Sequence, residues 1–197
     1  MAEGPSPTGP SAGFRHLRDE ERYRGWRISV VEATFRAPDG TEFSRDIVRH
    51  PGAVAVVAVT DDGDVLLVRQ YRGAVDGELL EIPAGTRDVD GEAPEETAHR
   101  ELLEEVGVHA GRIVRLGTML NSPGFCDEET HLFLATALEP GDHARDGVEE
   151  QHIEVVPVPL ADIDRLVASG ELIDGQTILG LLLARQALAT GGATAAP

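Results

Sequence analysis

The alternation of apolar and polar positions predicts antiparallel strands in the first half of the chain. Apolar residues mostly alternate through 26–35, and the turn sequence APDG at 37–40 separates them from 42–49, so these stretches are expected to form a β-hairpin. The continuous apolar run at 54–60 is typical of a strand that is covered on both faces. The turn sequence DDGD then leads into another strand at 65–71.

A helix is predicted in the middle of the chain. Residues 79–85 (LLEIPAG) are expected to form a short strand that runs into a tight turn, because Pro83 has no backbone N–H to donate. The helix starts at Pro94, a favoured first-turn residue, and Gly107 fits its C-cap. Its buried stripe repeats at a spacing of four residues: Ala98, Leu102 and Val106.

The second half of the chain adds strands and two further helices. Strands are expected at 113–120, 131–137 and 153–158, and helices at 160–168, ended by Gly170, and at 176–188. The polar, glycine-containing segment 139–150 is predicted to be a mobile loop of the kind that often covers an active site. One helix among many strands, with two helices at the end, favours an α/β class fold: an α/β/α sandwich with a mixed sheet and an N-terminal antiparallel hairpin.

Composition sets the expected limits of the domains. Residues 1–14 and 190–197 are rich in small residues and are expected to be a disordered leader and tail. Between them we expect an N-terminal β subdomain at 15–50, with structure starting near Tyr23, and a main domain at 51–189. The hairpin has no further sequence to cover both of its faces, so docking on a second subunit is a plausible use for it.

The charge and the cysteine content exclude several classes of function. The 197 residues include 35 acidic and 17 basic residues, all of the latter arginine, so neither a P-loop lysine nor a Schiff-base lysine is possible. A net charge of -18 makes binding to nucleic acid unfavourable. No membrane span or signal sequence is indicated, and the single Cys126 cannot form an internal disulfide, so we expect a cytoplasmic protein.

Three carboxylates crowd one side of the predicted helix. Glu101 and Glu105 lie nearly above each other, and Glu104 is within roughly a quarter turn of both. Like charges at this spacing repel one another unless a divalent cation neutralises them, and ligands that are all oxygen suit Mg²⁺ or Mn²⁺. The alternative is a solvated helix face in a very acidic protein.

The stretch 85–108 resembles the signature box of the Nudix hydrolases. Glu92 precedes Arg100 at the required spacing, and the remaining positions of the box are all filled: Arg100, Glu101, Leu102, Glu104, Glu105, Gly107 and Val108. Six residues separate Gly85 from Glu92, where the usual box has five. One extra loop residue costs little free energy and leaves the helical half intact, so it affects the shape of the loop rather than metal binding.

Further segments resemble one Nudix subfamily, the ADP-ribose pyrophosphatases: 45–54, 68–72, 81–85 and 122–125. This resemblance implies Mg²⁺-dependent hydrolysis of the pyrophosphate bond of ADP-ribose or a related ADP-sugar, which yields AMP and a sugar 5-phosphate. It also implies a domain-swapped homodimer, in which the N-terminal sheet helps to build the site of the partner. That expectation agrees with the uncovered hairpin.

The resemblance assigns the metal ligands within the box. It implies that Glu101 and Glu105 bind metal together with the backbone carbonyl of Ala84, and that Glu104 shares or supports a second ion. Two ions would clamp the diphosphate and lower the pKa of a bound water. Arg100 is expected to orient the carboxylates through a bidentate pair rather than to touch the substrate.

The general base is expected outside the box, on a loop that closes over the substrate. Glu150 is the first candidate and Glu149 the second, because the alignment can slip by one residue. The alternative is that both are surface glutamates in an acidic loop. His152 has a pKa range suited to a base, but its place at the start of a strand favours a structural role.

Five residues are predicted to contact the substrate. Arg72 opens a loop after a strand and can meet the diphosphate, although a surface ion pair is the alternative. Trp26 matches a position that stacks on adenine, or it belongs to a core. Arg45 and Glu128 match positions contributed across the dimer to phosphate and ribose. Glu81 is predicted to hold the sugar or metal, or to cap its turn.

Two other functions remain open from the sequence. The first is a Nudix pyrophosphatase that acts on GDP-sugars, dinucleotides or nucleoside triphosphates. The second is a catalytically silent, ligand-sensing Nudix module. Such a module typically loses carboxylates of the box and gains a DNA-binding extension, and neither change is seen here.

Overall fold

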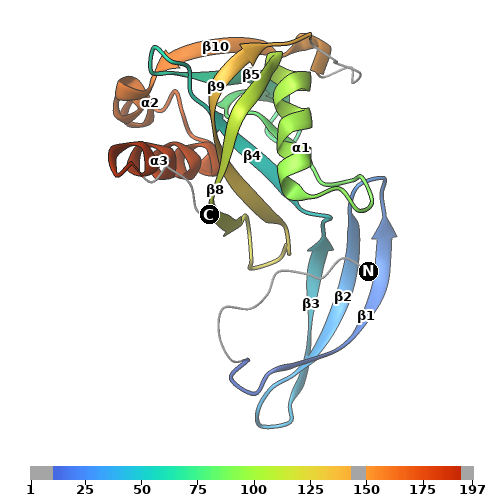
Figure 1. Cartoon of the computed structure of the whole chain (residues 1–197). Coiled ribbons are helices and arrows are strands. Elements are labelled where there is room, and N and C mark those ends of the chain that lie inside the picture. Colours follow the sequence, from blue (N-terminus) through green and yellow to red (C-terminus); the bar gives the residue numbers. More distant parts are fainter. Residues whose placement is uncertain (1–10, 143–149, 192–197) are drawn as a thin grey trace. The chain divides into compact units, whose positions relative to one another are not determined.

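The computed structural model describes residues 11–142 and 150–191, without the side chain of Glu150, and its chain falls into two units. The first unit is Met1–Ala53 with Met119–Thr130, and the second is Val54–Thr118 with His131–Pro197 (Figure 1). Within the described ranges, no helix is both long enough and apolar enough to cross a membrane.

The first unit contains an antiparallel sheet with the strand order β1-β2-β3. The predicted hairpin is confirmed by β2 (Ser29–Arg36) and β3 (Glu42–Arg49), which pair from Ser29 opposite Arg49 to Arg36 opposite Glu42. The prediction that structure starts near Tyr23 was wrong, because β1 (Arg15–Arg24) pairs with β2 along its length. Almost all of β1 is exposed, so it lacks the apolar alternation that marks a half-buried strand.

The second unit contains two sheets. The three-stranded sheet has the order β10 (Glu154–Pro159), β5 (Asp64–Arg72), β6 (Gly77–Glu81). The four-stranded sheet has the order β7 (Ala84–Thr86), β4 (Ala53–Ala58), β9 (Glu129–Pro140), β8 (Val108–Leu120). The strands predicted by apolar pattern are all present, and β8 and β9 are longer than predicted.

Helices cover both faces of the four-stranded sheet (Figure 1). They are α1 (Pro94–Glu101), α2 (Ile163–Ser169) and α3 (Gly175–Ala189), with short helical turns η1 (Leu102–Val106), η2 (Glu150–His152) and η3 (Leu160–Asp162). Val54 and Val56 of β4 belong to the core cluster that contains Leu102. Val57, which points to the other face, lies close to Gly180 of α3. Every residue of β4 is buried for this reason, and the predicted α/β fold with a mixed strand arrangement is confirmed.

Residues 82–84 join the two sheets and are held by three hydrogen bonds. The N–H of Ile82 donates to the hydroxyl of Thr177 in α3 at 3.0 Å, and the carbonyl of Pro83 accepts from Val56 of β4 at 2.8 Å. The N–H of Ala84 donates to Glu105 at 3.0 Å. One strand and a turn were predicted for 79–85, but this stretch contains parts of two strands, β6 and β7, in different sheets. They are separated at Pro83, which has no backbone N–H to donate to a sheet.

We expect Thr177→Val to lower the free energy of unfolding by about 1–3 kcal/mol, because it leaves the buried N–H of Ile82 without an acceptor in the same space. Thr177→Ser, which keeps the hydroxyl, is the matched control and should cost less. Urea unfolding of the two variants measures the difference. Equal stability of the Val and Ser variants would contradict the assigned role of this hydrogen bond.

Candidate active site

The helix that carries the predicted ligands changes its winding after Glu101. Leu102–Val106 form a π-helical turn, which Gly107 closes in the left-handed conformation at φ 67°. The C-cap is confirmed, but a regular α-helix up to Gly107 was a wrong expectation. Leucine and glutamate, which make up this turn apart from Val106, favour ordinary α-helix, so the local sequence does not predict the wider turn. Such turns are frequent at functional sites.

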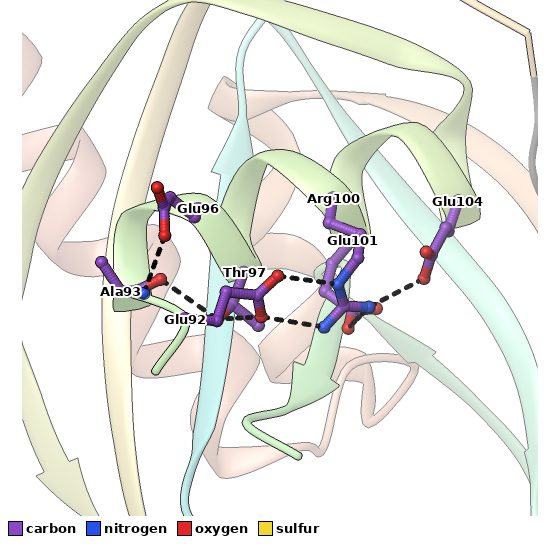
Figure 2. A network of polar contacts seen from close by, with 7 residues as sticks. All are labelled: Glu92, Ala93, Glu96, Thr97, Arg100, Glu101 and Glu104. Atoms are coloured by element: carbon purple, nitrogen blue, oxygen red, sulfur yellow. Dashed lines mark hydrogen bonds and ion pairs between the residues drawn. The ribbon is translucent and has the colours of Figure 1, made fainter. Parts of the chain in front are cut away.

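Arg100 contacts three carboxylates around the helix (Figure 2). Its Nε and Nη2 donate to the two oxygens of Glu92 at 3.2 and 3.3 Å. Its Nη1 donates to Glu101 at 2.7 Å and to Glu104 at 3.0 Å. Burial opposes the charged form, but these partners, Glu92 foremost, raise the pKa of Arg100 above its ordinary value. Arg100 therefore contacts Glu101 and Glu104, the two carboxylates that it is predicted to orient.

Glu105 is a buried carboxyl of the site whose pKa is strongly perturbed. Only 5% of the residue is exposed, and its Oε2 accepts the N–H of Ala84 at 3.0 Å. Burial, and after it the charges of Glu101 and Glu81, raise the pKa of Glu105 to about 8 against the opposing effects of the Ala84 N–H and of Arg72. The fold therefore holds two buried carboxyls close enough to disfavour their joint ionisation.

Gly85 leaves the space in which the carboxylate of Glu101 lies. A β-carbon at this position would overlap all three atoms of that carboxylate group. Gly85 therefore allows the Glu101 side chain to approach the backbone of β7, next to Ala84. The side chain of Glu105 reaches the same turn through the N–H of Ala84.

Arg72, the last residue of β5, and Glu81, the last residue of β6, form an ion pair across these antiparallel strands. The Nε of Arg72 lies 2.9 Å from Glu81 Oε2, and its Nη2 lies 2.7 Å from the same oxygen. The amide of Gln70 also donates to this oxygen, at 2.8 Å. Burial opposes the charge of Arg72, but Glu81 and then Glu105 raise its pKa. The pair thus keeps a guanidinium within electrostatic range of Glu105.

The donor set suits a hard divalent cation. Glu101, Glu104 and Glu105 supply oxygen ligands, and the mutual repulsion of Glu101 and Glu105 is what a cation would relieve. In the described parts of the chain, no three acidic, histidine or cysteine side chains form a ready-made cation cage. Arg100 instead turns Glu101 and Glu104 toward itself.

The candidate general bases fall at or beyond the limit of the residues that the structure describes. Glu149 is outside the described residues, and so is the side chain of Glu150, whose backbone begins η2. His152 ends the same short turn and is exposed.

The remaining predicted substrate residues belong to the first unit. Trp26 is 92% exposed, with the guanidinium of Arg27 5.0 Å from its ring centroid, so the alternative of a core tryptophan was wrong. Arg45 lies 4.9 Å from the Phe43 ring centroid. Glu128 lies 3.7 Å from Nδ1 of His50. A pocket of about 190 Å³ is lined in part by Trp26 and His50.

Sequence reasoning missed two positioning residues. Gln70 contacts the Arg72–Glu81 ion pair, and Thr177 holds the turn at 82–84. Gln70 is a buried polar residue that follows the apolar run VLLV of β5, and it occupies a buried position of that strand. Thr177 is fully buried in α3 and gave no comparable signal, because its partner Ile82 is distant in the sequence.

Comparison with known proteins finds a family and several relatives. The family model described as "NUDIX domain" matches residues 49–178. The chain is 41% identical to an ADP-ribose pyrophosphatase of Bacillus subtilis over 82% of this chain and 86% of that protein. It is 37% identical to an ADP-ribose pyrophosphatase of Mycobacterium tuberculosis over 93% and 88%, respectively.

Two more matches bear on specificity and on fold. A GDP-mannose pyrophosphatase of Citrobacter koseri is 31% identical over 72% of this chain and 81% of that protein. The solved structure described as "Crystal structure of ADP compounds hydrolase" has a TM-score of 0.80 at 24% identity, with 95% of this chain and all of that chain covered. At this level of identity, the second match supports the fold alone.

Without a divalent cation, we expect the protein to lose stability as pH rises from about 4.5 through about 8. A carboxyl whose pKa is higher in the folded than in the unfolded state favours folding at low pH, where it keeps its proton. Glu105→Gln removes this titration. We compare the free energy of unfolding of the variant with that of the wild type, both in a chelator. This difference should shift in favour of the variant by about 1 kcal/mol or more between about pH 6 and about pH 9.

Chemical denaturation at both pH values, with EDTA present, measures this change. Glu95→Gln, an exposed change on the same helix, is the control and should show no such dependence. Adding Mg²⁺ at about pH 8 should raise the melting temperature of the wild type more than that of Glu105→Gln. If Glu105→Gln follows the wild type at every pH, Glu105 does not carry the raised pKa.

Proposed function

We propose that this chain, which belongs to the Nudix hydrolase family, hydrolyses the pyrophosphate bond of ADP-ribose or a closely related ADP-sugar to AMP and a sugar 5-phosphate. It is a Nudix pyrophosphatase, since the family model matches more than half of the chain and its relatives at 41% and 37% identity are pyrophosphatases. The observation that carries the proposal is the placement of two buried carboxylates, Glu101 and Glu105, against the Ala84-Gly85 turn.

A divalent cation fits the chemistry of this placement. We propose that Glu101 and Glu105, with the carbonyl of Ala84, hold Mg²⁺ or Mn²⁺, and that Glu104 supports a second ion. When bound, the metal neutralises the diphosphate and makes water a better nucleophile. Arg100 then orients Glu101 and Glu104, both of which it already contacts. Glu81 holds Arg72 so that its remaining donors can meet the diphosphate.

The base is proposed to be Glu150, with Glu149 as the second choice. Both lie just before β10, a strand that pairs with β5, and β5 ends at Arg72. A glutamate here can take a proton from the attacking water at a point that the metal ligands do not occupy.

Recognition of the nucleoside is proposed for the first unit. Trp26 presents an exposed ring that suits stacking on adenine. Arg45 and Glu128 would reach phosphate and ribose from the other subunit of a homodimer, so the sheet β1-β2-β3 acts on the partner's substrate. The Nudix enzyme is thus proposed to be complete only as a dimer.

A GDP-sugar is the second candidate substrate. The relative named GDP-mannose pyrophosphatase, at 31% identity, favours it over dinucleotides and triphosphates. The same residues would cleave the same pyrophosphate bond, and only the contacts to the nucleobase and the sugar would differ. The catalytically silent module gains no support, because every carboxylate of the box is present.

A substrate panel tests the proposed activity. We expect ADP-ribose with Mg²⁺ to give AMP and ribose 5-phosphate, with kcat/KM at least about tenfold above GDP-mannose, dinucleotides and ATP. Product chromatography after incubation with each compound provides the measurement. Turnover of GDP-mannose without turnover of ADP-ribose would reject the proposed substrate and keep the family chemistry.

Glu150→Gln is expected to lower kcat by about 10²–10⁴-fold with little change in the affinity for Mg²⁺, because a base acts in the chemical step and not in metal binding. Glu149→Gln is the matched control on the neighbouring residue. Steady-state kinetics and a Mg²⁺ titration of each variant separate the two effects. A larger loss in Glu149→Gln would move the base by one residue, and equal rates in both variants and the wild type would place it elsewhere.

A further inference from the structure

A fully buried threonine of α1 contacts the acidic residue that precedes this helix (Figure 2). Thr97 is 0% exposed, and its hydroxyl lies 2.7 Å from Oε2 of Glu92 and 3.2 Å from the carbonyl of Ala93. That carbonyl also accepts the N–H of Thr97, at 3.1 Å. A hydroxyl has one hydrogen to donate, and the carboxylate is both nearer and charged. The hydroxyl of Thr97 therefore donates to Glu92.

The bond from Thr97 is the shortest of the hydrogen bonds that hold the carboxylate of Glu92. Arg100 donates to the same carboxylate from Nε and Nη2, at the longer distances of 3.2 and 3.3 Å. The pKa of Glu92 is lowered first by Arg100 and also by Thr97, so Glu92 is charged at neutral pH and can accept from both. Because Thr97 is buried in the helix, its hydroxyl is a fixed point against which Glu92 is held.

The position of Glu92 determines how the guanidinium group of Arg100 is turned. Because Nε and Nη2 donate to Glu92, Nη1 is the nitrogen shared between Glu101 and Glu104, at 2.7 and 3.0 Å. If Glu92 moved away, Nη2 would be free to turn toward the same two carboxylates and to form a bidentate pair with one of them. A cation would then have to displace a stronger ion pair before it could bind that carboxylate.

We propose that Thr97 is a positioning residue for the metal site. It holds Glu92, and Glu92 in turn keeps Arg100 in the orientation in which a single nitrogen is shared between Glu101 and Glu104. Thr97 thus favours binding of a divalent cation without contacting the cation or the substrate. This inference rests on the proposed function, which assigns these two glutamates to the metal.

A purely structural role for the Thr97 hydroxyl is the alternative, because it ties the residue before the helix to the first turns of α1. The start of the helix is held separately, however, since the N–H of Ala93 donates to Oε2 of Glu96 at 3.0 Å. The two roles predict different results. A structural role predicts lower stability at unchanged metal affinity, whereas a positioning role predicts weaker metal binding.

Titration of the full-length protein with Mn²⁺ in the absence of substrate tests the proposal. The free ion is measured by its electron paramagnetic resonance signal. In Thr97→Val, which has nearly the same shape but no hydroxyl, we expect the dissociation constant to rise by about fivefold or more, the scale that one lost hydrogen bond sets. Thr97→Ser keeps the hydroxyl and should bind as the wild type does. Thr130→Val is the control for loss of a buried hydroxyl, because Thr130 donates to Asn121, and it should also bind normally.

A double-mutant cycle shows whether Thr97 acts through Glu92. Glu92→Gln should weaken Mn²⁺ binding by itself. Adding Thr97→Val to that variant should then change the affinity by less than about twofold, because the bond between the two residues is already weakened. Additive effects of the two changes would overturn the proposal.

Melting curves show whether each variant is folded. Thr97→Ala lacks the same hydroxyl and favours helix, so it decides the matter if Thr97→Val is not folded. Equal Mn²⁺ affinity of the wild type and the folded variant would overturn the inference about Thr97, and hydrolysis of ADP-ribose by the wild type would leave the proposed function intact. If the wild type neither bound Mn²⁺ nor hydrolysed ADP-ribose, both would be wrong.

Discussion

The candidate site depends on how three consecutive backbone residues are anchored. The N–H of Ile82 donates a hydrogen bond to α3, and the carbonyl of Pro83 accepts one from β4. The N–H of Ala84 donates to a carboxylate of the helical segment that follows α1. Because β6 ends at Glu81 and β7 begins at Ala84, the turn lies where the two sheets of the second unit join. Anchoring from three directions lets a short turn hold its shape against crowded negative charge, which few exposed loops could do.

The crowding of these carboxylates lowers the stability of the fold but suits metal binding. Arg100 neutralises part of the charge, but Glu105 is buried near Glu101 and ionises only at a raised pKa. An arrangement that was optimal for stability would replace one of these carboxyls with a neutral group. The fold keeps both, and a divalent cation is the partner that would convert their repulsion into binding free energy.

The sequence predicted what local pattern determines and missed what tertiary pairing determines. The strand β4 was evident because helices cover both of its faces and all its residues are apolar. The exposed strand β1 has no such pattern, and its position comes from pairing with β2. The carboxylates of the box follow from helical spacing, whereas Gln70 and His131 meet their partners only when neighbouring strands have paired. The π-helical turn belongs to this second group.

The arginines show why net charge is a poor guide to where anions bind. The chain carries a formal charge of -18, so a phosphate approaching it meets an unfavourable field at long range. Many arginines are already paired with carboxylates of the same chain, as Arg100 and Arg49 are. Attraction for an anionic substrate must then come from the few guanidinium groups that keep spare donors, such as Arg72, and from bound cations. On the proposed function, a divalent metal would therefore help to recruit the substrate as well as take part in the reaction itself.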